Sequence, residues 1–279
     1  MEAMNLKICP RSPFMKLIVD YYQLVKIPEP MMLRTLPNGR LDAWINFSGN
    51  FCMMDERTGE FIIAPETGFF PLTDRSMLIK ISEPIVCLNI KFFPIVLLYG
   101  NLNKLLNTKQ LVSFTKVFEA ELDKAILGIL PDEENIDSII RVVEEFFINQ
   151  LSAKDQEETC LFPILQRIEN DTFNAASVRC LAREFNLTEK TLERTFIRQL
   201  GLKPKGYSQI VRFQKTVKDI RSSTLNASKL RLDLSLANGY YDQSHFVKES
   251  RKIAGLSPTV LFRNLLPGFA DLMVSDEQQ

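Results

Sequence analysis

The sequence contains a single histidine, His245, among 279 residues. One imidazole cannot form the multi-histidine clusters that hold most catalytic zinc, iron or nickel ions. The five cysteines are odd in number and form no Cys-x-x-Cys pair; they are Cys9, Cys52, Cys87, Cys160 and Cys180. This spacing argues against a cysteine-built zinc site and against a disulfide framework. We therefore predict reduced thiols, no bound metal and no cofactor.

Long hydrophobic runs are also absent. No apolar stretch approaches the roughly 18 residues that a transmembrane helix needs. The N-terminal sequence MEAMNLKICPRSPFMK lacks the uninterrupted apolar segment of a secretory signal peptide. We therefore expect a cytoplasmic protein that does not associate with membranes. With 46% hydrophobic and 24% charged residues, the chain has a globular composition and is long enough for two domains.

The chain has no net charge, but this zero is the sum of two unlike parts. Residues 171–266 carry 17 Lys and Arg against 8 Asp and Glu, a net charge of +9, so the remaining residues carry −9. Such asymmetry indicates that the C-terminal part meets a polyanion and that the N-terminal part does not.

Residues 6 to about 93 consist of short apolar stretches separated by Pro, Gly and Asn. These stretches are FMKLIVDYYQLV, DAWINF, EFIIAP, SMLIKI and PIVCLNIKFF. Their β-branched and aromatic content predicts an antiparallel sheet, sandwich or small barrel. Core packing is the favoured role of the only tryptophan, Trp44. A sugar or aromatic-ligand pocket is the alternative, with Tyr21, Tyr22, Trp44 and Phe47 as weak candidates for its lining.

Beyond Pro94 the spacing of apolar residues becomes helical. One set of apolar residues comprises Leu111, Phe114, Phe118, Leu122 and Ile126, and a second comprises Ile136, Ile139, Ile140, Val143 and Phe147. Spacings of three and four predict two amphipathic helices within residues 111–150. They cover the sheet of their own chain or form a homodimer interface. The polar stretch LSAKDQEETC at 151–160 follows as a domain boundary.

An internal repeat lies in the C-terminal part. The sequence TLERTFIRQLGLKP at 191–204 aligns with HFVKESRKIAGLSP at 245–258, at a constant offset of 54 residues. In each copy a short helix (SVRCLAREF or KLRLDLSLA) leads through a turn to a capping residue, Thr188 or Asp242, and then to a second helix. This arrangement predicts one supersecondary unit used twice, the helix-turn-helix.

The second helix of each unit has a polar outward face. In the first copy Leu192 and Phe196 define the buried side, so Lys190 and Arg194 lie nearly opposite. The flanking residues are Glu193, Ile197 and Arg198, and the second copy presents Gln243, Ser244, Val247, Lys248, Arg251 and Lys252. Arg, Lys and Gln are the side chains that read base edges in the major groove, so we predict binding to double-stranded DNA.

His245 occupies the position of Thr191 in the repeat, on the flank of its helix and beside the buried Phe246. A half-buried hydrogen-bonding role or a phosphate contact fits this position better than catalysis, which needs an orienting neighbour.

The quoted residues resemble the AraC/XylS family of bacterial transcription regulators over about 174–264. The two segments that carry the resemblance are CLAREFNLTEKTLERTFIRQLGLKPKGY and GYYDQSHFVKESRKIAGLSPTVLFR. The resemblance implies two helix-turn-helix units joined by a long helix at about 205–222. It places base-reading positions on Lys190, Glu193, Arg194, Gln243, Ser244, Val247 and Lys248. Arg212, Lys215 and Lys218 on the connecting helix are then available for phosphates, with Arg198, Arg251 and Lys252 beside them.

Three positions depart from the family pattern. The family usually has Phe where this chain has Ser250, often an aromatic residue at Ala254, and Ala at Ser235. These changes predict a weaker apolar core in the second unit and a gap that Ser250→Phe would fill. The stretch LPNGRLDAWINFSG is similar, more weakly, to the β-barrel sensor domains that precede this DNA-binding domain in many members. That likeness implies a small organic effector and often dimerisation.

These observations predict an α+β protein. We expect a β-barrel or cupin-like sensor domain with helical cover at 1–155, followed by an all-α double helix-turn-helix domain at 156–279. The predicted function is sequence-specific regulation of transcription by equilibrium DNA binding. One alternative is a ligand-binding or interaction protein with a degenerate DNA-binding domain. Another is a DNA-repair alkyltransferase regulator, which the dispersed cysteines disfavour.

Overall fold

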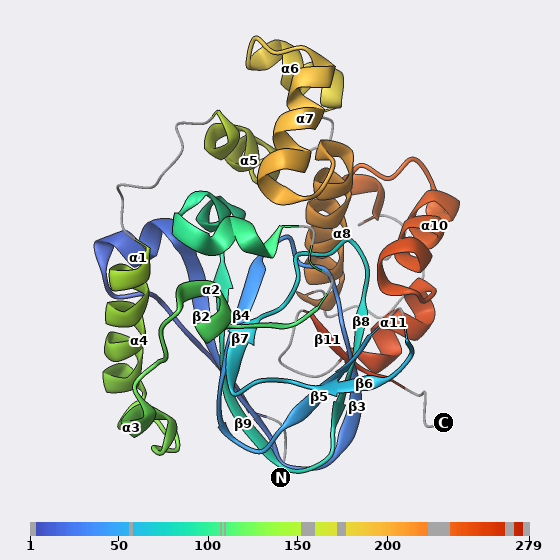
Figure 1. Ribbon diagram of the computed structural model, residues 1–279. Helices are drawn as coiled ribbons and strands as arrows, with labels where there is room; N and C mark the ends of the chain where they lie inside the picture. Colours follow the sequence, from blue (N-terminus) through green and yellow to red (C-terminus); the bar gives the residue numbers. More distant parts are fainter. Residues whose placement is uncertain are drawn as a thin grey trace.

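Two antiparallel β-sheets make up the N-terminal half of the computed structural model, and a helical domain lies against one end of them (Figure 1). The structure describes residues 4–55, 58–106, 108, 110–151, 160–171, 177–222, 235–265 and 271–275.

The first sheet has six strands in the order β1-β2-β9-β4-β7-β10. Their bounds are β1 Met4–Ile8, β2 Val19–Ile27, β4 Leu41–Ser48, β7 Thr67–Phe69, β9 Ile85–Phe92 and β10 Val112–Ser113. The second sheet has five strands in the order β11-β3-β8-β5-β6. Their bounds are β3 Met31–Thr35, β5 Phe51–Met54, β6 Phe61–Ile63, β8 Met77–Ile81 and β11 Leu272–Val274. The described strands thus form an open cupin-like sandwich rather than a closed barrel.

The space between the two sheets holds an apolar core. Trp44 is fully buried there against Phe51 and Phe70, and its indole N–H donates to the carbonyl of Pro65 at 2.8 Å. The single tryptophan therefore packs in the core, as its position in a β segment predicts.

Helices cover the outer face of the first sheet. They are α1 Pro13–Ile18, the 3₁₀ helices η1 Pro94–Leu98 and η2 Gly100–Leu105, α2 Phe114–Phe118, α3 Lys124–Leu127 and α4 Ile136–Gln150. The apolar face of α4 is buried, and Phe147 contacts both Phe69 and Phe92 of the sheet. This α4 face therefore covers its own chain's sheet, the first of the two alternatives that its pattern left open.

Two details of the expected elements are wrong. Residues 13–18 form a helix instead of the start of a strand, because Pro13 at the first helical position favours a helical turn. The helix expected over 111–126 is two short ones. Glu119 adopts a left-handed conformation (φ 57°) that ends α2, and the Asp123 side chain then caps the start of α3.

The helical domain follows the repeat closely. Its elements are α5 Leu161–Glu169, α6 Val178–Glu184, α7 Glu189–Leu200, α8 Pro204–Ser222, α10 Gln243–Ala254 and α11 Pro258–Asn264. The predicted capping residues are confirmed: Thr188 accepts from Thr191 N–H and Asp242 from His245 N–H. Gly201 and Gly255 end α7 and α10 at φ 69° and 76°, left-handed values that glycine adopts without strain. The second helices of the two units, α7 and α10, are here called the reading helices. Both the start and the end of α10 lie 54 residues after those of α7.

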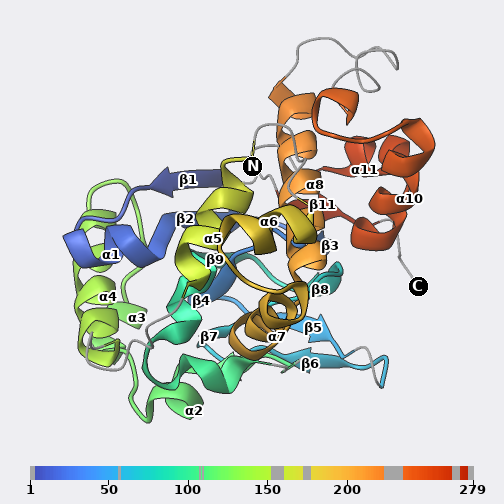
Figure 2. The same cartoon turned by 90° about the horizontal axis from the view of Figure 1, so that it is seen from above.

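The predicted connecting helix is confirmed as α8, which stands between α7 and α10 (Figure 2). The first helix of the second unit, expected at 229–237, lies mostly outside the described residues, as does most of the expected domain boundary at 151–160.

The chain ends by returning to its N-terminal half. Beyond α11, strand β11 pairs antiparallel with β3 and becomes the edge of the second sheet. The backbone N–H of Leu36 donates to Asp271 at 2.8 Å, and Ser275 N–H donates to Met32 at 2.9 Å. One strand of the N-terminal sandwich therefore comes from the C-terminal end of the described chain.

Candidate nucleic-acid interface and the adjoining pocket

The outward face of α7 is exposed and charged. Leu192 and Phe196 are fully buried, and the predicted contact residues Lys190, Glu193, Arg194 and Arg198 are all exposed. A 3.6-residue period around the two buried positions produces this division of the helix. The helix therefore presents three cations and a carboxylate on its open side.

The corresponding face of α10 is also basic. Gln243, Ser244 and Lys248 are exposed, and Val247 is half-buried. Arg251 and Lys252 are exposed in the last turn, where Lys252 Nζ donates to Gln209 Oε1 of α8 at 2.7 Å. The structure thus brings the predicted residues of each unit onto one open face.

The connecting helix α8 holds the three remaining phosphate candidates, and they differ in availability. Lys218 is exposed and Lys215 is half-buried. Arg212 forms an ion pair with Glu249 and lies 4.6 Å from the ring centroid of Tyr240, and its side chain is only 14% exposed. A phosphate would have to displace Glu249, so we withdraw Arg212 from the phosphate set.

Glu249 is the centre of a buried polar cluster inside the second unit. It is 3% exposed, and Tyr240 O–H donates to its Oε1 at 2.6 Å. His245 Nε2 lies 3.9 Å from the other oxygen, and the Tyr241 backbone N–H donates to His245 Nδ1 at 3.4 Å. His245 is thus a half-exposed member of this cluster on the flank of α10.

The three residues that depart from the family pattern are fully buried. Ser235, Ser250 and Ala254 each have 0% exposure. The Ser250 hydroxyl donates to the carbonyl of Leu256 at 2.8 Å, so a satisfied polar contact stands where we expected a gap. A larger side chain at this position would displace that contact and its surroundings.

A cleft of about 560 Å³ separates the two units along α8. Its lining includes Arg179 and Lys205, both exposed, together with Ser208, Gln209 and His245. Arg179 and Lys205 are not among the phosphate contacts predicted from the sequence. The feature of the sequence that could have identified them is their position in the N-terminal turns of α6 and α8.

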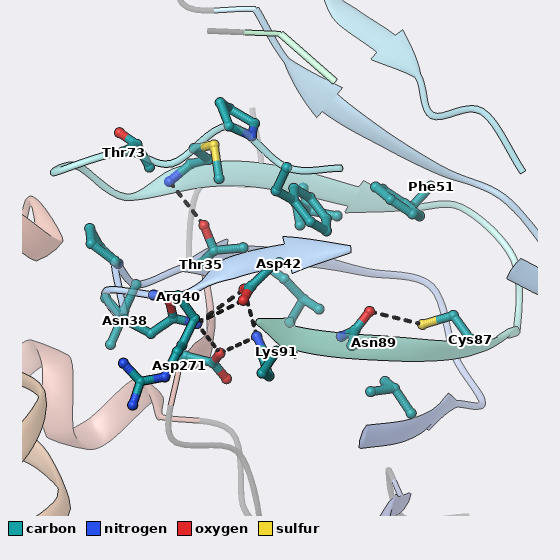
Figure 3. Close-up of a pocket in the computed structure, with 18 of the residues that line it drawn as sticks. Thr35, Asn38, Arg40, Asp42, Phe51, Thr73, Cys87, Asn89, Lys91 and Asp271 are labelled. Carbon is teal, nitrogen blue, oxygen red and sulfur yellow. Dashed lines mark hydrogen bonds and ion pairs between the residues drawn. The ribbon is translucent and has the colours of Figure 1, made fainter. Parts of the chain in front are cut away.

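A second, mainly apolar pocket lies between the two sheets of the sandwich, at the end nearest the helical domain (Figure 3). Its volume is about 70 Å³, which holds a few water molecules. The apolar wall includes Val25, Ile27, Leu33, Phe51, Phe70, Ile79, Ile81, Ile85 and Cys87. The polar end includes Asn38, Arg40, Asp42, Asn89, Lys91 and Asp271.

Lys91 on β9 organises the polar end. Its Nζ donates to Asp42 Oδ2 at 2.6 Å and to Asp271 Oδ2 at 2.5 Å, and the side chains of Lys91 and Asp271 are 5% and 6% exposed. Asn38 Nδ2 donates to both carboxylates, at 3.0 Å to each. Figure 3 shows the two carboxylates converging on one ammonium.

Burial and mutual attraction shift the pKa of each group in this cluster. Burial alone would lower the pKa of Lys91, but Asp271 and Asp42 raise it above its ordinary value. Burial would raise the pKa of Asp271, and the attraction of Lys91 with its hydrogen bond more than offsets this and holds the pKa low. Asp42 is the weaker acid, because burial raises its pKa more than Lys91 lowers it. Burial also raises the pKa of the Cys87 thiol to about 12.

The four aromatic candidates for ligand binding do not line this pocket. Tyr22 is buried and donates to Glu144 at 3.2 Å, Tyr21 lies under the ammonium of Lys7, and Phe47 packs at the margin of the main core. Trp44 packs in the core between the two sheets, against Phe51 and Phe70 of the pocket wall. The residues that line the pocket come from several strands and loops, so no local pattern in the sequence identifies them.

The loop beside the pocket mouth contacts the helical domain. Arg40 forms a bidentate pair with Glu169 of α5 at 2.8 and 3.1 Å, and Tyr207 O–H of α8 donates to the same carboxylate at 2.6 Å. Gln214 of α8 donates to the carbonyl of Pro37 at 2.7 Å. The residues that close the pocket are thus also the residues that position α5 and α8.

Neither a metal-ligand cluster nor a membrane-spanning helix is found among the described residues. Within the described ranges, no three His, Cys, Asp or Glu side chains cluster as metal ligands would. The helices of the same part of the chain include none that is both long and apolar enough to span a bilayer.

Comparison with known proteins identifies the C-terminal domain. A family model for a helix-turn-helix domain matches residues 181–264, and this family consists of transcription regulators rather than enzymes. No curated protein matches the sequence.

Solved structures of ToxT from Vibrio cholerae share the fold of the whole chain. The form with a bound unsaturated fatty acid has a TM-score of 0.54 at 11% identity, covering 89% of this chain and 96% of that one. The form bound to (E)-4-(8-methylnaphthalen-1-yl)but-3-enoic acid has a TM-score of 0.51 at 12% identity, covering 86% and 97%. At this identity the likeness concerns the fold alone. Residues 181–264 thus form a helix-turn-helix domain of the AraC type, and it follows a β-sandwich in a chain that shares the ToxT fold.

Proposed function

We propose that the chain binds specific DNA sites through α7 and α10, and that a small apolar acid in the sandwich pocket modulates this binding. The observation that carries the proposal is the pair of reading helices, which have equal length, side-chain N-caps, glycine C-caps and exposed basic faces at a constant offset of 54 residues. Such duplication supports two major-groove contacts by one chain.

The DNA contacts divide into two classes. Base reading is assigned to Lys190, Glu193, Arg194, Gln243, Ser244, Val247 and Lys248. Phosphate contact is assigned to Arg198, Lys215, Lys218, Arg251 and Lys252, joined by Arg179 and Lys205 from the cleft. The 19 residues of α8 span about 28 Å, which is compatible with reading helices in successive major grooves about 34 Å apart.

The effector half of the proposal rests on the chemistry of the pocket. An apolar chamber that ends in a buried ammonium is suited to a molecule with an apolar body and an acidic head. The ligands named in the two ToxT structures, a fatty acid and an aryl butenoic acid, are of this class. Contacts of the pocket loop with α5 and α8 give such a ligand a path to the DNA-binding domain.

Titration of genomic DNA fragments at several salt concentrations tests the DNA half. If the seven cations assigned to phosphates each neutralise one, log Kd should change with log salt with a slope of about 6.3 in magnitude. A salt-independent affinity, or no binding, would instead support the alternative of an interaction protein with a degenerate DNA-binding domain.

Three further points remain proposals. We place the domain boundary near residue 155, with 271–275 structurally part of the first domain. We place the protein in the cytoplasm, where its DNA is. A homodimer through the N-terminal domain or residues 111–150 is the third. The buried face of α4 is already used within the chain, so a dimer would need another surface.

A further inference from the structure

Strand β11 contributes side chains to two separate apolar cores. Val274 packs against the apolar core of the sandwich, whereas Met273 is fully buried in the core of the second helix-turn-helix unit, with Phe213, Phe246 and Leu261. The alternation of a strand sends these neighbouring side chains to opposite faces. The position of the second unit is therefore tied to whether β11 stays on the sheet.

The polar end of β11 reaches the pocket. Asp271 stands immediately before the strand and lines the pocket wall, with its Oδ2 on Lys91. Its other oxygen, Oδ1, is buried and has no hydrogen-bond partner among the described residues. A buried acceptor without a partner is destabilising, so Asp271 is held less firmly than a fully bonded carboxylate would be.

We propose that β11 is a detachable strap, and that the Asp271 carboxylate occupies the place on Lys91 that the acidic head of the effector takes. This inference rests on the proposed effector site and specifies how that site is regulated. An apolar acid would displace Asp271, release β11 from the edge of β3, and free the second unit from the sandwich.

Charge favours this exchange. Lys91 already serves two carboxylates, so a third ionised one would leave two uncompensated negative charges in a buried site. Departure of one resident carboxylate relieves this repulsion. Asp42 lies on β4, which pairs with β7 on one side and β9 on the other, whereas β11 has three residues and pairs only with β3 among the described strands. Asp271 is thus the carboxylate that can move.

The size of the pocket leads to the same conclusion. A volume of about 70 Å³ holds a few water molecules and is too small for an alkyl chain of ten carbons. Admitting such a ligand requires one wall to move, and Asp271 adjoins a three-residue strand that pairs with β3 alone among the described strands.

Coupling between two events is reciprocal, so the inference can be tested by adding the acid or by loosening β11. If an acid loosens β11, then loosening β11 must tighten the binding of the acid by the same factor. The Asp271→Asn variant removes the competing charge on the strap. Asp42→Asn is a matched control, because it removes the other charge on Lys91 and leaves the strap in place.

The experiment uses the full chain, with decanoate as probe and decanamide as its uncharged counterpart. Calorimetry gives the affinities, and hydrogen exchange gives the protection of residues 272–275. Decanoate should increase exchange there in the wild type, and decanamide should not. Asp271→Asn should increase exchange without ligand and bind decanoate about fivefold more tightly or better. In Asp42→Asn, residues 272–275 should keep their wild-type protection.

Each result decides one of the two proposals. If decanoate binds but residues 272–275 stay protected, and Asp271→Asn leaves both exchange and affinity unchanged, the strap inference fails and the effector pocket stands. If neither the wild type nor Asp271→Asn binds decanoate, the effector pocket and the strap fail together. The salt test of DNA binding is independent of both.

Discussion

The two helix-turn-helix units have matching reading helices but are attached to the sandwich in different ways. The core of the first unit, with Leu192, Phe196 and Leu200, is continuous with the core under the first sheet. The second unit has a separate core, to which the sandwich adds only Leu36 and β11 among the described residues, and its other contacts with the sandwich are polar. Ser76 N–H, for example, donates to the carbonyl of Ile253 at 3.0 Å.

This difference shows where a regulated movement is least costly. Separating the first unit would expose a continuous apolar interface, at about 25 cal/mol for each Å². Separating the second unit breaks hydrogen bonds and one short strand pairing, which water can replace in part. We therefore expect the first unit and the sandwich to move as one body and the second unit to change position.

The largest expected effect comes from the ion pair that only the second unit has. In Glu249→Gln, Arg212 loses its counter-charge in a mostly buried site, which should lower the free energy of unfolding by about 3 kcal/mol. The matched change in the first unit is Thr195→Val, 54 residues earlier, which we expect to stay within about 1 kcal/mol. Urea denaturation measures both, and equal losses would contradict the difference drawn between the two units.

A smaller effect should separate the two reading faces. Arg194→Ala removes a side chain capable of a bidentate guanine contact and should weaken specific DNA binding by about 1–3 kcal/mol. Lys248→Ala should cost less, because Lys is a single point donor. Arg141→Ala on α4 is an exposed control that should leave DNA affinity unchanged. Fluorescence anisotropy ranks the three, and a larger loss for Lys248→Ala would reverse our order of the two units.

The third prediction concerns the core of the second unit. The sequence suggested that Ser250→Phe would stabilise it, but Ser250 is fully buried and bonded to Leu256. We now expect this substitution to destabilise by about 1–3 kcal/mol through overpacking. Ser250→Ala, which loses only the hydrogen bond, should cost about 1 kcal/mol. A higher melting temperature for Ser250→Phe than for wild type would mean that free space exists there.

Local signals explain what the sequence could predict. The bounds of α7, α8 and α10 follow from capping residues, left-handed glycines and prolines that lie within a few positions of each helix end. The break between α2 and α3 was hidden, because the apolar spacing continues across it while Glu119 reverses the backbone. Signals between residues close in sequence therefore predicted the helices of the DNA-binding domain better than the elements of the sandwich.

The pocket could not be predicted, because its parts are distant in sequence. Asp42, Lys91 and Asp271 come from three separate segments, and Asp271 meets Lys91 across 180 positions. The pairing of β4 with β9 places Asp42 opposite Lys91, and the pairing of β11 with β3 adds Asp271. A three-residue strand has too little pattern to identify its partner. The same limit explains why Arg212 was assigned to phosphates, since its partner Glu249 lies on another helix.

The origin of β11 has a consequence for biosynthesis. Ribosomes release a chain from its N-terminus onward, and domains generally fold in that order. The strand that completes the second sheet, and the carboxylate that completes the pocket, emerge only after both helix-turn-helix units. Until then β3 is an open sheet edge, which is prone to pairing with other chains. A fragment that ends near residue 155 would keep that edge and lack Asp271, so its solubility and ligand affinity should differ from those of the full chain.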